Sequence, residues 1–179
     1  MPSDGFIRVF TEYLRRKYCN NATVFMAMTC SSTVQGESEV ADILLRATLV
    51  EIRSCVDDAA NDNVFLPVNF GTSHWVCLAI DKANKKLQLC DSLNKRKIVE
   101  VLKNLATEIV SGVLGGEYEV TTLQTPRQND GDRCGVFVCL RFWGQVSSDA
   151  PEDITPRVIT RWGMLRAVME MKRNESTTL

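Results

Sequence analysis

The sequence is short of histidine and has no excess of charge of either sign. Its 179 residues include one histidine, and 21 basic residues are balanced by 22 acidic ones. The resulting net charge of −1 gives no broad positive field that would attract a nucleic-acid backbone. We therefore expect no polynucleotide partner.

The sequence also lacks a Cys-x-x-Cys pair. Its seven cysteines are scattered, at Cys19, Cys30, Cys55, Cys77, Cys90, Cys134 and Cys139. An odd, dispersed set matches neither a disulfide framework nor a zinc ribbon, and one histidine adds little to these thiols as metal ligands. We expect most of the cysteines to be reduced and buried, and we predict no metal site and no cofactor.

Long hydrophobic runs are absent. No apolar stretch approaches the roughly 18 residues that cross a bilayer, and the opening Met-Pro-Ser-Asp-Gly lacks the layout of a secretory signal. We expect an intracellular protein, in the nucleus or the cytoplasm, with no membrane partner. The length and the 45% hydrophobic content suit a single domain over residues 1–179.

Apolar spacing separates helices from strands. Apolar residues three and four apart predict helices at 4–18, 38–57, 98–109, 134–143 and 155–169. Short apolar runs predict strands at 64–68, 75–80, 87–90 and 118–123, with a hairpin joining the second to the third. The segment 19–36 is mixed and receives no element, and 125–132 is a polar loop. The predicted fold is α+β, with a central mixed sheet packed between helices.

Cys134 lies between the polar turn "DGDR" and an apolar run that is predicted to be helical. If the helix begins there, the N–H groups and dipole of its first turn favour a thiolate, which is the nucleophilic form of cysteine. Gly135 would leave space for an incoming carbonyl. The alternative is that Cys134 is simply a small buried hydrophobic residue.

His74 opens the strand "HWVCLAI" and is the only imidazole available as a general base. Asp91 ends the next predicted strand, "KLQLCD", so a hairpin would bring the two side chains together, and a carboxylate there would orient the imidazole. Gln128 precedes Cys134 by six residues and could join the Cys134 N–H in an oxyanion hole. Taken singly, each has a plainer interpretation: a structural histidine, an Asx turn and a solvated glutamine.

The ordered set "HW", "DS" and "QNDGDRCGVFVC" resembles the signature of the ubiquitin-like protease family, the SUMO-specific or sentrin-specific cysteine proteases. The resemblance extends over nearly the whole chain. The opening "SDGFIRVFTEYL" is similar to the family's first segment, "VFLPVNF" to the strand before the family histidine, and "RVITRWGMLRAVMEM" to its closing helix.

The resemblance implies an α/β cysteine-protease core whose nucleophile lies at the N-terminus of a buried central helix. Family members cleave after the Gly-Gly tail of SUMO or a related modifier, either maturing a precursor or releasing the modifier from a substrate lysine. The implied roles are nucleophile for Cys134, general base for His74, orientation of that base for Asp91, and oxyanion stabilisation for Gln128.

The resemblance also implies substrate-binding residues. Trp75 matches the tryptophan that would form one wall of a slot for the diglycine tail, although it could equally be a core anchor. Asn129, Gly131 and Gly135 match the family motif around the nucleophile. The partners implied are SUMO or a related ubiquitin-like modifier and its conjugates.

The sequence departs from the family pattern at two places. Arg133 stands where the family has an aspartate before the nucleophile, and Met1-Pro2 stands where it has Trp-Leu. These departures keep two alternatives open. One is a domain that binds a modifier without cutting it, and the other is an acetyltransferase, because related cores of the same clan carry out acetyl transfer.

Overall fold

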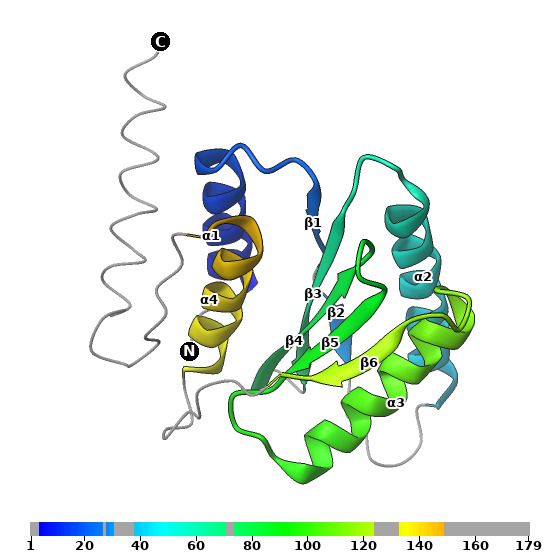
Figure 1. The fold of residues 1–179 in the computed structure, drawn as a ribbon. Helices are drawn as coiled ribbons and strands as arrows, with labels where there is room; N and C mark the ends of the chain where they lie inside the picture. The colour runs from blue at the N-terminus through cyan, green and yellow to red at the C-terminus, as the bar shows by residue number, and fades with distance from the viewer. Residues whose placement is uncertain (1–3, 27, 31–37, 71–73, 124–132, 149–179) are drawn as a thin grey trace.

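The computed structural model describes residues 4–26, 28–30, 38–70, 74–123 and 133–148 (Figure 1). The helices of these ranges are α1 (Asp4–Lys17), α2 (Ser38–Asp57), α3 (Arg96–Gly112) and α4 (Cys134–Val146). The strands are β1 (Thr23–Phe25), β2 (Met28–Cys30), β3 (Asn63–Phe70), β4 (His74–Asp81), β5 (Lys86–Cys90) and β6 (Glu119–Thr122).

The strands form one mixed sheet in the order β1-β3-β4-β5-β6, with β2 also pairing with β3. The central strands β3, β4 and β5 are antiparallel neighbours. Parallel pairs lie on both sides of them, β1 and β2 on β3, and β6 on β5. The predicted mixed sheet is therefore confirmed.

The sheet lies between two helical layers, with α1 and α4 on one face and α2 and α3 on the other (Figure 1). Strand residues alternate between the two layers, as the two-residue period of a strand requires. In β4, Val76, Leu78 and Ile80 pack with α2 and α3. Trp75, Cys77 and Ala79, which alternate with them in sequence, pack with α1 and α4. The α+β class, with a sheet between helices, is confirmed.

The helices and strands predicted within the described ranges are present, with ends that differ by a few residues. The strands β1 and β2 were not predicted, because three residues are too few to display an alternating pattern. Their position depends on parallel pairing with β3, a contact between distant parts of the chain. The predicted loop at 125–132 and the helix predicted at 155–169 lie outside the described residues.

Six of the cysteines belong to the described side chains, and all six are free thiols. Four of them are buried, at Cys77, Cys90, Cys134 and Cys139. In the part of the chain that the structure describes, no helix combines the length and the apolar character needed to cross a membrane.

Candidate active site

The antiparallel pairing of β4 and β5 brings the first residue of one strand close to the last residue of the other. His74 opens β4, and Asp91 follows β5 directly. The register pairs Cys77 with Cys90, so His74 and Asp91 lie at the same end of the hairpin. The helix α4 begins at Cys134 at this same end of the sheet (Figure 1).

A short hydrogen bond joins His74 to Asp91. The His74 Nε2 and Asp91 Oδ1 atoms are 2.8 Å apart, and both side chains are less than a tenth exposed. Burial alone would raise the pKa of Asp91, but His74 and backbone N–H groups lower it below its ordinary value. The carboxyl group is therefore ionised and can only accept, so Nε2 donates the proton. The other ring nitrogen, Nδ1, is not engaged by Asp91 and can exchange a proton with another group.

Backbone donors hold the Asp91 carboxylate in place. The Leu93 N–H donates to Oδ1 at 3.0 Å, and the Lys95 N–H donates to Oδ2 at 3.1 Å. Asn94, with a φ of 48°, lets the chain turn back toward the carboxylate. The plainer interpretation of Asp91 as an Asx turn thus holds together with its contact to His74, because the turn fixes the carboxylate that meets the ring.

The Cys134 thiol lies beside His74 at the first residue of α4. Its Sγ accepts a hydrogen bond from the backbone N–H of Trp75 at 3.3 Å. Burial raises the pKa of Cys134, but His74 together with the N–H groups of Trp75 and Gly135 outweighs it and brings this pKa below its ordinary value. The surroundings of the sulfur therefore favour a thiolate.

A second cysteine of the same helix separates the effect of burial from that of the site. Cys134 and Cys139 both have an exposed fraction of 0%. Burial raises the pKa of Cys139 far above its ordinary value, because no compensating donor acts on it. Cys134 shifts in the opposite direction. Both are buried in the α1–α4 layer, but Cys134 is also an activated thiol.

The imidazole of His74 shifts in the complementary direction. Burial would lower its pKa, but Asp91 and Cys134 together raise it to about 9. Its Nδ1 atom is buried and has no hydrogen-bond partner among the described residues. An imidazolium and a neighbouring thiolate attract each other, so His74 and Cys134 each favour the charged form of the other.

The remaining predicted residues divide into two groups. Gln128, Asn129 and Gly131 lie outside the described residues. Trp75 is 3% exposed and belongs to the hydrophobic cluster beneath α1 and α4, and Gly135 is buried in the first turn of α4.

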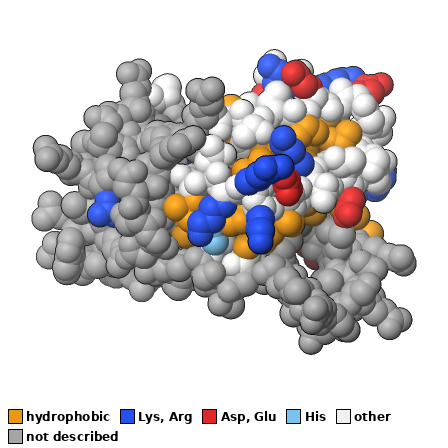
Figure 2. Space-filling model, turned by 90° about the horizontal axis from the view of Figure 1, so that it is seen from below, with side chains coloured by type: hydrophobic (Ala, Val, Ile, Leu, Met, Phe, Trp, Pro, Cys, Tyr) orange, Lys and Arg blue, Asp and Glu red, His pale blue; other side chains and the backbone are white. Residues whose placement is uncertain are grey.

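Arg133 is half-buried and occupies the position before α4, with φ −103° and ψ 0°, and its side chain makes no capping hydrogen bond to the helix. Figure 2 shows basic side chains beside exposed hydrophobic surface on the face that carries the single histidine.

Sequence reasoning missed the backbone donors of this site. The Trp75 N–H that contacts the sulfur comes from an ordinary strand residue, so no sequence signal identifies it. The Leu93 and Lys95 donors could have been predicted, because an Asx turn at "CDSL" implies that following N–H groups donate to the Asp91 carboxylate.

Comparison with known proteins places the chain among proteases. The model of the Ulp1 protease family, C-terminal catalytic domain, matches residues 10–177. Ubiquitin-like-specific protease 1 of Saccharomyces cerevisiae is 31% identical over 99 residues, which cover 51% of this chain and 16% of that protein. The chain thus spans about a sixth of the length of this curated relative.

Solved structures share the fold. The yeast Ulp1 protease domain in complex with Smt3, the yeast ortholog of SUMO, has a TM-score of 0.62 at 23% identity and covers 93% of this chain and 72% of its own. The Xanthomonas campestris effector XopD, bound to ubiquitin, has a TM-score of 0.62 at 20% identity, with 94% and 90% covered. The match of the family model over nearly the whole sequence establishes that the chain belongs to the Ulp1 protease family.

Proposed function

We propose that this chain is a thiol protease that cleaves after the C-terminal Gly-Gly of SUMO or a related ubiquitin-like modifier, with Cys134 as nucleophile. The observation that carries the proposal is the pair of opposite pKa shifts at one end of the sheet. The pKa of His74 is raised to about 9, and that of Cys134 is lowered although the thiol is buried. Such a pair holds an imidazolium beside a thiolate.

The proposed reaction has two halves. The Cys134 thiolate attacks the carbonyl carbon of the terminal glycine, and the developing oxyanion is stabilised by the Cys134 N–H and the Gln128 amide. His74 donates its proton to the leaving lysine amine or peptide nitrogen, and a thioester remains. A water molecule then gives a proton to His74 and attacks the thioester, releasing the modifier carboxylate and the free enzyme.

Asp91 is proposed to orient His74 and to stabilise its cationic form. The hydrogen bond of 2.8 Å to Nε2 supports this role, since Nδ1 is then not engaged by Asp91. The two backbone donors on the carboxylate add support, because they restrain it while the imidazole changes charge. The acid thus acts through His74 and does not contact the substrate.

Two considerations support a modifier tail as substrate. Relatives in the family include the yeast protease that was solved in complex with Smt3. A slot that admits only residues without a Cβ would accept a diglycine tail and exclude bulkier sequences. We propose Trp75 as one wall of this slot, with Asn129, Gly131 and Gly135 lining the approach to the nucleophile, and the whole of 1–179 as one catalytic domain.

A panel of tail-reactive modifier probes tests the proposal. SUMO, ubiquitin and related modifiers that carry an electrophile at the terminal glycine are incubated with the wild-type chain and with Cys134→Ala. We expect covalent labelling by SUMO probes in the wild type and none in the variant. Labelling that persists in Cys134→Ala, or binding of the probes without any covalent product, contradicts the proposed enzyme. Preferential labelling by ubiquitin contradicts the choice of SUMO.

A further inference from the structure

A pocket of about 270 Å³ lies between helix α1 and strand β1, well away from Cys134. Residues of α1 form one wall, β1 forms the other, and Phe142 of α4 contributes to its lining. Thr23, in β1, pairs with Asn63 at the start of β3, whereas His74 pairs with Phe70 at the end of β3. These positions are about 23 Å apart along the strand. This α1–β1 pocket is therefore distinct from the candidate active site.

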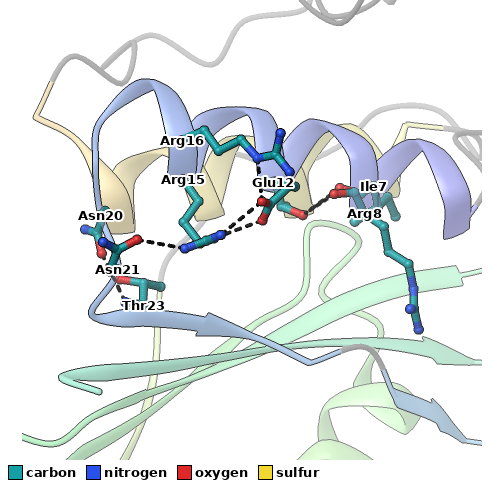
Figure 3. Close-up of polar contacts among 9 residues, drawn as sticks. Ile7, Arg8, Glu12, Arg15, Arg16, Asn20, Asn21 and Thr23 are labelled. Atoms are coloured by element: carbon teal, nitrogen blue, oxygen red, sulfur yellow. Dashed lines mark hydrogen bonds and ion pairs between the residues drawn. The ribbon is translucent and has the colours of Figure 1, made fainter. Parts of the chain in front are cut away.

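The wall formed by α1 is polar. Arg8, Thr11, Glu12 and Arg15 recur at three- and four-residue spacing, so they lie on one side of the helix and line the pocket (Figure 3). The opposite, apolar side of α1 is buried in the α1–α4 layer. An amphipathic helix usually turns its polar side to open water, whereas here that side overlooks the edge of the sheet.

The acidic residue of this wall is already fully engaged. Arg15 donates to both carboxylate oxygens of Glu12, at 2.9 and 3.0 Å, and Arg16 adds a bond at 2.7 Å. The hydrogen bond from Arg15, with further help from Arg16, lowers the pKa of Glu12 to about 2. Arg15 also donates to Asn21 at 2.9 Å (Figure 3). Both carboxylate oxygens of Glu12 therefore already accept hydrogen bonds, so Glu12 does not require a cationic ligand.

Two polar groups of the pocket are available to a ligand. Arg8 is exposed, and its guanidinium extends away from the Glu12–Arg15 contact (Figure 3). The Thr23 hydroxyl is buried without a partner, and the residue is 1% exposed. Thr11, by contrast, donates to the Ile7 carbonyl at 2.8 Å. A buried hydroxyl without a partner is costly, so a ligand that satisfies Thr23 would be favoured.

The remainder of the pocket is apolar and lies at an open strand edge. Phe25 and Phe142 line it and pack edge to face with ring centres 5.9 Å apart. Among the described strands, β1 pairs with β3 alone and stands at the end of the strand order. The Thr23 N–H already donates to Asn20 Oδ1 at 3.0 Å. Within the described part of the chain, the other outer backbone groups of β1 are open to an extended peptide, as in strand addition. These features favour a peptide over a small soluble anion.

We propose that the α1–β1 pocket binds a glutamate side chain of an extended acidic segment in a partner protein. The carboxylate accepts hydrogen bonds from Arg8 and the Thr23 hydroxyl, and the methylene groups contact Phe25, which packs in turn on the buried Phe142. The segment itself lies along β1. This docking site goes beyond the proposed protease function and does not depend on it, because none of its residues belongs to the Cys134 site.

Nuclear magnetic resonance on the isotope-labelled full chain tests the proposal with a defined probe. The probe is the capped pentapeptide acetyl-Thr-Val-Glu-Val-Thr-amide, and its matched control replaces Glu by Gln. We expect the glutamate peptide to shift the backbone signals of 23–25, and the glutamine peptide to bind roughly tenfold more weakly, since a charge-assisted hydrogen bond is lost.

Variants of the protein identify the pocket. Arg8→Gln should weaken binding of the glutamate peptide roughly tenfold, and Thr23→Val, which keeps the side-chain shape, should weaken it severalfold. Lys103→Gln removes the same positive charge from an exposed position on α3 and should leave binding unchanged. Labelling of Cys134 by a modifier probe should be the same in all three variants, so failure of docking is distinguishable from failure of the protease proposal.

Three results would overturn the inference. One is equal binding of the glutamate and glutamine peptides, because the carboxylate would then have no role. A second is binding that survives in Arg8→Gln or falls equally in Lys103→Gln, because general surface charge would then explain it. The third is the absence of any shift at 23–25 up to millimolar peptide, or a shift there with free glutarate and none with the peptide.

Discussion

The backbone N–H of Trp75 donates a hydrogen bond to the sulfur of Cys134 across 3.3 Å. The donor belongs to the residue that follows His74, so the strand that carries the imidazole also stabilises the thiolate through its main chain. A main-chain donor is fixed by the pairing of β4 with β3 and β5, and it does not change charge with pH. The activation of Cys134 therefore has one part that depends on His74 and another that does not.

Alkylation of Cys134 by iodoacetamide should reveal both parts. In the wild type, we expect the rate to inflect below the ordinary thiol value of about 8.5. In His74→Ala, the inflection should move upward, because burial, the largest influence on the pKa of Cys134, is then opposed only by the N–H groups of Trp75 and Gly135. Peptide mass spectrometry follows Cys134 separately from Cys19, the exposed thiol. A wild-type inflection near 8.5 would show that Cys134 is not activated.

The Asp91→Asn substitution should move the alkaline limb of the pH profile. Cleavage requires the Cys134 thiolate, which forms above the lowered thiol pKa, and a protonated His74, which persists below a pKa of about 9. Asp91 is a main cause of the raised His74 pKa, so its neutralisation should shift the alkaline limb of kcat/KM to lower pH. The orientation of the ring also weakens, and kcat/KM should fall on the order of a hundredfold or more.

Glu108→Gln provides the matched control for this profile. It removes one carboxylate from an exposed position of α3 and should leave both limbs and the rate unchanged. If the alkaline limb of Asp91→Asn coincides with that of the wild type, Asp91 does not set the pKa of His74, and its proposed positioning role is wrong.

Phe142→Ala should destabilise the fold by about 3–5 kcal/mol. Phe142 is 0% exposed, and its ring lies 5.2 Å from that of Phe65 and 5.9 Å from that of Phe25, so it anchors α4 to the sheet. Urea unfolding measures the loss of free energy. Val101→Ala, at a position 48% exposed on α3, is the control and should change stability little. A loss below about 1 kcal/mol for Phe142→Ala would contradict this anchoring role.

The central part of the fold could be predicted because its signals are local. The strands β3 and β4 are buried along nearly their whole length, since helices cover both faces of the sheet. The shorter β5 alternates polar and apolar residues before it ends at Cys90, and α3 shows a regular apolar spacing. The edge strands β1 and β2 carry no such signal. Each is three residues long, and each is a strand only because β3 supplies hydrogen-bonding partners from a distant part of the sequence.

The candidate site likewise has one part that local sequence signals predict and another that depends on contacts between distant residues. A single histidine at a strand start and an aspartate after the next strand suffice to predict that the two side chains approach each other in an antiparallel hairpin, and they lie 2.8 Å apart. The direction of the Cys134 shift could not be obtained from sequence. Cys139 also has no exposed surface on the same helix, but burial alone acts on its pKa, whereas His74 and the N–H groups of Trp75 and Gly135 lower that of Cys134.

Gln88→Ala should destabilise the protein more than its half-buried position suggests. Gln88 Oε1, on β5, accepts a hydrogen bond from Arg141 Nη2 on α4 at 2.8 Å, and the Arg141 Nε is buried without a partner among the described residues. Loss of this acceptor leaves more of a half-buried guanidinium unsatisfied, at a cost of about 1–3 kcal/mol. Gln88→Glu keeps the acceptor and adds a compensating charge, so it should be at least as stable as the wild type. Urea unfolding measures the free energy of unfolding of both variants. An equal decrease in Gln88→Ala and Gln88→Glu would show that the contact with Arg141 does not stabilise this position.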